Sequence, residues 1–266
     1  MTFNFAAKTH GPLARNPEHN FAMNHSIMFY RTSALYTFIP KNACSTLRLT
    51  AAFENGCIDD IKDGHWIHSN NQTFKPTLSE AIKADYTFVV LRCPFRRLAS
   101  VFLDKFVAKE GPAWAYRDFT KRNIELDKLT FRQFVLGLRQ PGALNLNNHW
   151  RPQHHFLLYK QYSDYFSVEK FPILVEKLKQ KLAIEVTDAR SLTNHGLDTF
   201  ESLYDKDYSR AQSAHLANLK RQGKVPSYVN LYTADLIEVV KKLYQKDFEL
   251  YLEHFNESDL LFSYSS

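Results

Sequence analysis

Short apolar runs and helically spaced apolar residues follow one another along the chain. Two apolar runs bounded by polar residues, at residues 34–39 and 85–92, predict buried strands. Apolar residues that recur at intervals of three and four predict helices, over residues 47–53, 78–83, 95–107, 131–138, 173–182 and 231–251. Strands interleaved with helices indicate an α/β fold with a largely parallel sheet flanked by helices.

The chain shows no break that would divide it into several domains. It has no internal repeat and no low-complexity linker. Its 266 residues, of which 44% are hydrophobic and 14% aromatic, can bury a large core. We therefore predict a single domain over residues 1–266. Within it we expect an irregular N-terminal arm over residues 1–30, where Gly11-Pro12 and Asn16-Pro17 are turn signals.

The charge of the chain is mildly basic. The 34 Lys and Arg residues exceed the 28 Asp and Glu residues by 6, which favours an anionic ligand, a membrane surface or nucleic acid, or simply a solvated basic surface. No long basic run occurs, so we expect no nucleic-acid partner. No segment approaches the roughly 18 uninterrupted apolar residues of a membrane span, so we expect a cytoplasmic protein whose membrane contact would be peripheral.

The three cysteines, Cys44, Cys57 and Cys93, form an odd set without metal-ligand spacing. Neither a disulfide framework nor a zinc site fits this count, and a reducing compartment does.

The stretch YTFIPKNACSTLRL, residues 36–49, runs from a strand end into a helix start. Such a turn aims backbone N–H groups and the positive end of the helix dipole at one point, which suits an anion. Lys41 adds a mobile charge, and the hydroxyls of Ser45 and Thr46 add donors. Taken alone, the stretch fits a plain connection with Ser45 as N-cap equally well.

A second stretch, VVLRCPFRRLASVFLDKF at residues 89–106, repeats the order of strand, short loop and helix. Arg92 lies at the carboxyl end of the strand and Ser100 on the following helix. Two such crossovers place two anion-binding turns at the same edge of a parallel sheet. A ligand with two separated phosphate-like groups is indicated.

The two stretches resemble the 5′-phosphosulfate and 3′-phosphate signatures of sulfotransferases, closest to carbohydrate enzymes such as the chondroitin and dermatan 4-O-sulfotransferases. In that family the signatures read approximately PKxGCTxxxR and RxPFxRLxSxxxxKF. Ser45 stands in the threonine position of the first, Ala43 replaces its glycine, and Cys93 replaces a polar or acidic residue of the second. The matching residues are Pro40, Lys41, Cys44, Arg48, Arg92, Pro94, Phe95, Arg97, Leu98, Ser100, Lys105 and Phe106.

Two further segments support the resemblance. NNHWRPQ at residues 147–153 resembles the family's NxHWxPQ, and LYQKDFELY at residues 243–251 resembles its C-terminal YxxDFxLF helix. The four segments follow the family order over nearly the whole chain. The membrane anchor and the cysteine cluster of the family's luminal enzymes have no counterpart here, so we expect a soluble, bacterial relative of cytoplasmic location.

The resemblance implies one P-loop-NTPase-like sulfotransferase domain. It also implies metal-free transfer of a sulfonate from 3′-phosphoadenosine 5′-phosphosulfate (PAPS) to a hydroxyl of a carbohydrate or glycolipid acceptor, by in-line displacement. Lys41 is then expected beside the bridging oxygen, and Arg92 and Ser100 at the 3′-phosphate. The loop expected around the 5′-phosphate comprises Lys41, Asn42, Ala43, Cys44, Ser45 and Thr46. Arg48 is expected to be structural.

Transfer to a hydroxyl calls for a general base, and histidine is the usual choice. His68, between the two signatures in HWIHSNN, aligns roughly with a histidine of related carbohydrate sulfotransferases and is our first candidate. His149 is the second and His65 the third. Trp150 and Arg151 are candidates to line the acceptor cleft, with a place in the core as the alternative for Trp150. Residues 221–224, RQGK, form a flap over the 3′-phosphate or an exposed turn.

Two other classes of function are alternatives to a sulfotransferase, namely a kinase and a polyanion-binding protein. A P-loop-type kinase predicts a glycine-rich loop and a magnesium-binding acid at a strand end, and the sequence has neither. A non-enzymatic polyanion binder predicts salt-dependent binding without turnover. The identity of the acceptor and the oligomeric state are not encoded in a readable motif, and we expect residues 108–150 and 190–228 to select the acceptor.

Overall fold

The computed structural model describes residues 2–7, 11–68, 72–120, 125–189, 192 and 200–264, with the backbone alone for His68. Its contacts divide the chain into two compact units. The first unit comprises Met1–Leu91 and Gln153–Asn194, and the second comprises Arg92–Pro152 and His195–Ser266. The single domain expected from the sequence stays a prediction.

The first unit contains a four-stranded sheet of order β1-β2-β3-β4. The edge strand β1 (Ser26–Phe29) is antiparallel to β2 (Ala34–Thr37), whereas β3 (Tyr86–Leu91) and β4 (Asp164–Ser167) run parallel to β2. Both predicted strands are confirmed with ends shortened by one or two residues. The carboxyl ends of β2 and β3 therefore lie at the same edge of the sheet.

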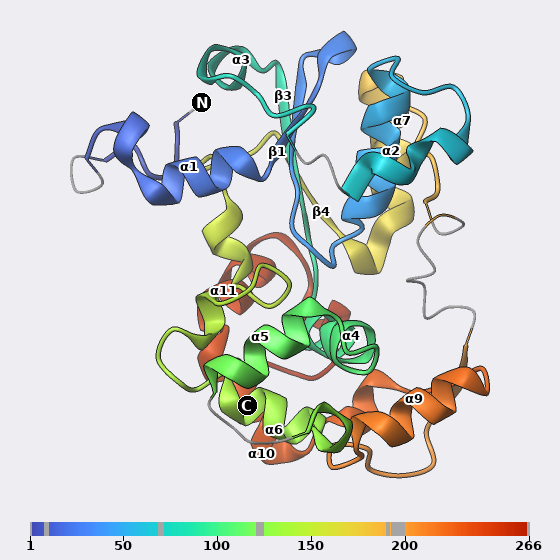
Figure 1. The fold of residues 1–266 in the computed structure, drawn as a ribbon. Helices are drawn as coiled ribbons and strands as arrows, with labels where there is room; N and C mark the ends of the chain where they lie inside the picture. The colour runs from blue at the N-terminus through green and yellow to red at the C-terminus, as the bar shows by residue number, and fades with distance from the viewer. Residues whose placement is uncertain are drawn as a thin grey trace. The chain divides into compact units, whose positions relative to one another are not determined.

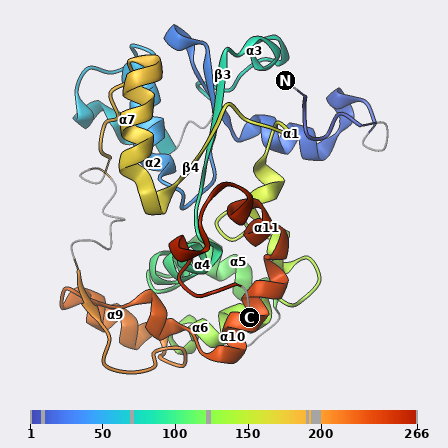
Figure 2. The same ribbon diagram turned by 180° about the vertical axis from the view of Figure 1, so that it is seen from behind.

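Helices lie on both sides of this sheet (Figures 1 and 2). On one side are α2 (Cys44–Glu54) and α7 (Phe171–Leu182), and on the other are α1 (Pro17–Asn24) and α3 (Leu78–Lys83). The buried core includes apolar residues of the sheet together with residues of α2 and α7. A mixed α/β unit with a mainly parallel, helix-flanked sheet agrees with the predicted fold class.

The N-terminal segment is more regular than the arm expected from its turn signals. Asn16 accepts a hydrogen bond from the backbone of His19, and Pro17 occupies the first turn of α1. The Asn-Pro pair is thus a helix start rather than a turn in an irregular arm. β1 follows directly after α1 and completes the sheet.

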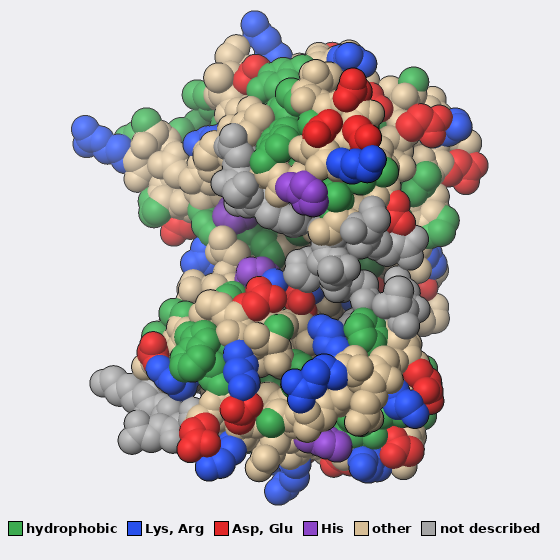
Figure 3. All heavy atoms as spheres, turned by 45° about the vertical axis from the view of Figure 1, so that its right-hand side comes forward, with side chains coloured by type: hydrophobic (Ala, Val, Ile, Leu, Met, Phe, Trp, Pro, Cys, Tyr) green, Lys and Arg blue, Asp and Glu red, His purple; other side chains and the backbone are tan. Residues whose placement is uncertain are grey.

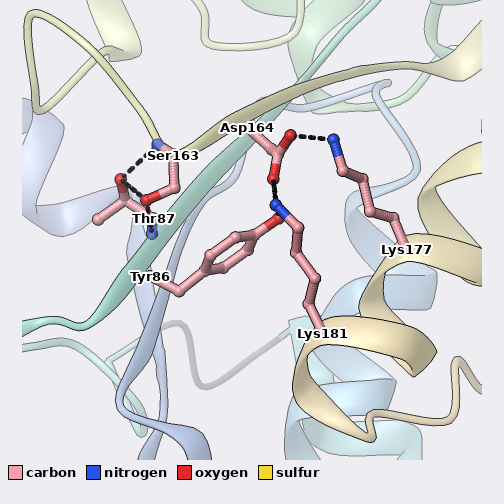
Figure 4. Close-up of polar contacts among 6 residues, drawn as sticks. All are labelled: Tyr86, Thr87, Ser163, Asp164, Lys177 and Lys181. Carbon is pink, nitrogen blue, oxygen red and sulfur yellow. Dashed lines mark hydrogen bonds and ion pairs between the residues drawn. The ribbon is translucent and has the colours of Figure 1, made fainter.

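Polar side chains fix the edge of the sheet at β4 (Figure 4). Thr87 and Ser163 exchange hydrogen bonds, each backbone N–H donating to the other hydroxyl, at 3.0 and 3.1 Å. Asp164 accepts hydrogen bonds from the Tyr86 hydroxyl at 2.5 Å and from Lys181 at 2.7 Å, and it also pairs with Lys177. Burial tends to raise the pKa of Asp164, but the hydrogen bonds from Lys177, Lys181 and Tyr86 lower it below its ordinary value. These contacts attach α7 to the sheet.

The second unit is mainly helical and has an aromatic core. Its elements are α4 (Pro94–Val101), a π-helix (Phe102–Phe106), α5 (Gly111–Phe119), α6 (Phe131–Gly137), α9 (Ser213–Arg221), α10 (Ala234–Leu243), α11 (Gln245–His254) and a small parallel sheet of β5 (Glu201–Leu203) and β6 (Lys224–Pro226). Phe102, Phe106 and Phe134 pack face to face or tilted in this core. The helix predicted over residues 231–251 is two helices, because Tyr244 leaves the helical conformation with φ −115° and ψ 24°.

Candidate functional site

The first turn, residues 38–43, connects β2 to α2 in the first unit. Lys41 has a φ of 73° and Ala43 a φ of 56°, both in the left-handed region that residues other than glycine rarely adopt. Ala43 stands where the family pattern has glycine, which adopts this conformation without strain. At this position the backbone therefore has the conformation expected for the family's glycine, although the residue is an alanine.

Helix α2 begins without a side-chain cap. Its N-cap residue is Ala43, and its first helical hydrogen bond runs from the Leu47 N–H to the Ala43 carbonyl at 3.2 Å. The N–H groups of the residues between them, 44–46, therefore have no acceptor within the helix, and they lie at the positive end of its dipole. Ser45 is inside the helix, so its reading as the N-cap is wrong. The turn presents backbone donors suited to an anion.

The side chain of Asn42 attaches this turn to two other segments of the first unit. Its amide nitrogen donates to the Val90 carbonyl at 2.9 Å and to Oε1 of Gln153 at 2.6 Å. Asn42 is 0% and Gln153 1% exposed. Val90 belongs to β3 and Gln153 opens a short 3-10 helix, so one buried amide joins three segments.

A buried cation of α2, Arg48, packs against a residue of this turn. The guanidinium carbon of Arg48 lies 4.0 Å from the centroid of the Phe38 ring, and Arg48 is buried. The neighbouring Tyr36 hydroxyl is also buried, and burial raises its pKa well above the ordinary value, with a further contribution from Cys44 and an opposing one from Arg48. This placement supports the structural role expected for Arg48.

The second turn belongs to the second unit and has an unstrained backbone. Arg92 follows the last residue of β3, Cys93 precedes α4 with a φ of −46°, and Pro94 fills the first helical position. The guanidinium of Arg92 donates to the Tyr228 hydroxyl at 3.4 Å, and Arg92 as a whole is half-buried. Ser100 lies on α4 and is 6% exposed.

The buried Arg97 of the second signature holds a loop. Its guanidinium donates to the backbone carbonyls of Arg151 at 2.8 Å and Asn148 at 3.1 Å. Trp150, between these two, is fully buried, and its indole N–H donates to the Ala143 carbonyl at 2.9 Å. Trp150 is therefore a core residue, which closes the alternative that it lines an acceptor cleft.

Of the three histidine candidates, His149 has the most informative surroundings. The backbone N–H of His149 donates to Oδ1 of Asn147 at 3.0 Å, which identifies that atom as an oxygen acceptor. The Nδ1 atom of His149 lies 2.7 Å from the same oxygen, so Nδ1 is the donor in this contact. His65 is exposed, and the side chain of His68 lies outside the described residues.

The stretch at residues 221–224 is an exposed turn. Gly223 has a φ of 76°, and Lys224, at the start of β6, pairs with Glu201 at 3.4 Å. The ordinary-turn interpretation of RQGK agrees with this geometry.

The surface and the metal-ligating side chains add little to the site. On the face shown in Figure 3, lysine and arginine side chains are interspersed with aspartate and glutamate. In the part of the chain that the structure describes, no three His, Cys, Asp or Glu side chains gather as metal ligands. Among the same residues, no helix has the length and hydropathy needed to cross a bilayer.

Comparison with known proteins identifies the family of the chain. A family model described as the sulfotransferase family matches residues 24–252. No curated protein and no solved structure matches the chain significantly. The mainly parallel, helix-flanked sheet is consistent with the fold of that family. Because the match covers well over half of the sequence, the chain belongs to the sulfotransferase family.

Proposed function

We propose that this sulfotransferase uses PAPS and transfers its sulfonate to a hydroxyl of a carbohydrate or glycolipid acceptor. The observation that carries the proposal is the uncapped start of α2 behind two left-handed residues, Lys41 and Ala43. A helix start that lacks a side-chain cap and carries a lysine in the preceding turn has the donors and charge that a phosphosulfate needs. The proposal deepens the family assignment, which establishes a sulfotransferase but neither the donor nor the acceptor.

The donor set fits the two anionic ends of PAPS. For the 5′-phosphosulfate we propose the N–H groups of residues 44–46, the hydroxyls of the half-buried residues Ser45 and Thr46, and the ammonium of Lys41. Arg92 and Ser100 are proposed for the 3′-phosphate, because a guanidinium and a hydroxyl are common partners of phosphate. P-loop-like binding of the phosphosulfate by the first turn is part of this proposal.

PAPS supplies a sulfonate already activated by its link to a phosphate. In the proposed displacement, the acceptor oxygen forms the new bond to sulfur as the bond from sulfur to the bridging oxygen breaks, and a histidine takes the acceptor proton. Lys41 stabilises the charge that develops on the bridging oxygen. His68 remains the first candidate base and His149 the second, and the contact with Asn147 supports His149 because it holds the imidazole ring in one orientation.

The remaining features of the proposal follow from the resemblance. The acceptor is a sugar hydroxyl, the protein is cytoplasmic, and no nucleic acid and no resident metal take part. Any membrane contact, for example to reach a glycolipid, is peripheral. An experiment has to distinguish this function from two alternatives, a P-loop-type kinase and a non-enzymatic polyanion binder.

Donor turnover tests the proposal directly. The protein is incubated with PAPS and a panel of desulfated polysaccharides and glycolipids, and release of 3′-phosphoadenosine 5′-phosphate (PAP) is measured against ATP as the alternative donor. The proposal predicts PAP release that depends on one class of sugar acceptor, and no ADP from ATP. Phosphoryl transfer from ATP would support the kinase, and salt-sensitive binding of polyanions without turnover of either nucleotide would support the binder.

A further inference from the structure

The first turn contains two strained residues that its own sequence does not stabilise. Lys41 and Ala43 are both left-handed, and neither is a glycine, asparagine or aspartate, the residues that adopt this conformation most easily. Such conformations persist where the surrounding structure determines them from outside. Something other than local preference therefore fixes the residues on either side of Asn42.

The side chain of Asn42 is the contact that can do so. It is 0% exposed, and its two amide protons are used by the Val90 carbonyl at 2.9 Å and by Oε1 of Gln153 at 2.6 Å. Among the described residues, no donor reaches its own Oδ1. The orientation of this amide therefore depends on the two acceptors that its nitrogen reaches, and leaving that nitrogen without them would be costly in a buried place.

Asn42 belongs to the first signature, whereas its hydrogen-bond partner Gln153 lies outside that signature. It is 1% exposed and begins the 3-10 helix Gln153–Phe156, directly after Pro152. It is the last residue of the segment NNHWRPQ, so two of the segments on which the resemblance rests meet at this hydrogen bond.

We propose that Gln153 is a positioning residue of the donor site and acts through Asn42. By accepting from Asn42, it holds residues 41–43 in the strained shape that directs Lys41 and the N–H groups of α2 at an anion. Gln153 itself does not contact the donor. The part of this inference that concerns PAPS rests on the function proposed above, while the part that concerns the shape of the turn does not.

Amide hydrogen exchange without any ligand tests the shape of the turn. In Gln153→Met, which keeps the length and burial of the side chain and removes its acceptor, amides of residues 40–47 should exchange on the order of tenfold faster, while those of β3 and β4 stay unchanged. Ser26→Ala is the matched control, because it removes another buried hydrogen bond of the first unit, to the Ala22 carbonyl at 3.0 Å. Unchanged exchange in the turn, or an equal loss of protection throughout the first unit, would overturn the proposal.

Calorimetric titration with PAP tests the consequence for binding. Gln153→Met should weaken PAP binding on the order of tenfold, whereas Ser26→Ala should leave it unchanged. In an Asn42→Ala background the same change should have no further effect on affinity, because the contact through which Gln153 acts on the turn is already absent. Independent, additive losses would show that Gln153 acts otherwise.

The two measurements keep the proposals apart. If wild type fails to bind PAP while Gln153→Met still loosens residues 40–47, the positioning role stands and the donor assignment fails. If wild type binds PAP and Gln153→Met binds it equally well, the donor assignment stands and the positioning role fails.

Discussion

The two turns proposed to bind the donor of this sulfotransferase have different backbone conformations. The first turn has two left-handed residues, Lys41 and Ala43, and opens a helix without a side-chain cap. The second has no positive φ, and Pro94 starts its helix in a conformation that proline already favours. The strained backbone of the first turn thus depends on the outside contacts of the Asn42 amide, whereas the second turn has a backbone that its residues adopt without strain.

This difference suggests a division of work between the turns. A strained, externally anchored turn offers preorganised donors where charge changes during the reaction, and stored strain of this kind is typical of catalytic loops. A relaxed turn with a guanidinium suits a phosphate whose charge stays constant. We therefore expect the first turn to affect the rate and the second to affect the affinity for the donor.

The largest expected effect is that of Lys41→Ala on the rate. Loss of the ammonium removes charge stabilisation at the bridging oxygen, and kcat should fall about 100-fold to 1000-fold while the Kd for PAP changes little. Steady-state kinetics with PAPS and calorimetry with PAP measure the two quantities. Arg92→Ala is the counterpart from the second turn and should raise the KM for PAPS more than it lowers kcat. If kcat, KM and Kd changed in the same way in both variants, the two turns would not differ in their roles as proposed.

The next effect concerns the base. If His149 accepts the acceptor proton, His149→Gln should lower kcat about 100-fold, and the acidic limb of the rate profile, where protonated imidazole cannot accept a proton, should disappear. Asn147→Ala should change that limb by releasing the tautomer that its oxygen fixes. His68→Gln is the parallel variant. Whichever histidine variant retains the acidic limb is not the base.

A smaller effect is expected from a substitution in the first unit outside the first turn, which should change stability but not donor binding. Asp164→Asn should lower the free energy of unfolding by about 1–2 kcal/mol at neutral pH, since Lys177 and Lys181 lose their carboxylate but remain partly hydrated. Affinity for PAP should not change. Urea unfolding followed by circular dichroism measures the first quantity.

The pH dependence of that variant has a definite sign. The folded pKa of Asp164 lies below its ordinary value of 3.8, so its stabilising contribution is present above that value and disappears as the pH falls through the folded pKa. The stability difference between wild type and Asp164→Asn should therefore shrink in acid. A difference that is constant from neutral pH to pH values below the folded pKa would contradict the ionic role of Asp164.

The smallest effect, and the most direct comparison of the two backbones, comes from glycine substitution. Ala43→Gly relieves a left-handed residue and should stabilise the protein by up to about 1 kcal/mol. Cys93→Gly, at the corresponding place before α4, has no strain to relieve and should destabilise it. Equal effects of the two substitutions would mean that the turns do not differ in strain.

Elements of the fold could be predicted from the sequence where local residue pattern alone determines the structure. The apolar run at residues 85–92 predicted β3 to within one residue of each end, because a buried strand needs little else. β4 was missed because it opens with Asp164, whose burial depends on lysines of a helix formed later in the chain. β1 was missed because SIMF is short and follows a segment rich in turn signals.

For the candidate site, too, the local residues could be predicted from the sequence and the long-range contacts could not. The residues of both turns could be named from their spacing and the family resemblance, including the alanine in the glycine position. The contact between Asn42 and Gln153 could not, because a glutamine after a proline carries no local signal and its partner lies 111 residues away. Such long-range polar contacts are set by the fold rather than by the pattern of the chain.

The most direct test of the central claim is to compare PAP with AMP, which lacks the 3′-phosphate, by calorimetric titration of wild type and Arg92→Ala. We expect wild type to prefer PAP strongly, and Arg92→Ala to lose this preference while its affinity for AMP stays close to that of wild type. A wild type that binds the two nucleotides equally, or an Arg92→Ala variant that still prefers PAP, would contradict the claim that the second turn recognises the 3′-phosphate of a PAPS donor.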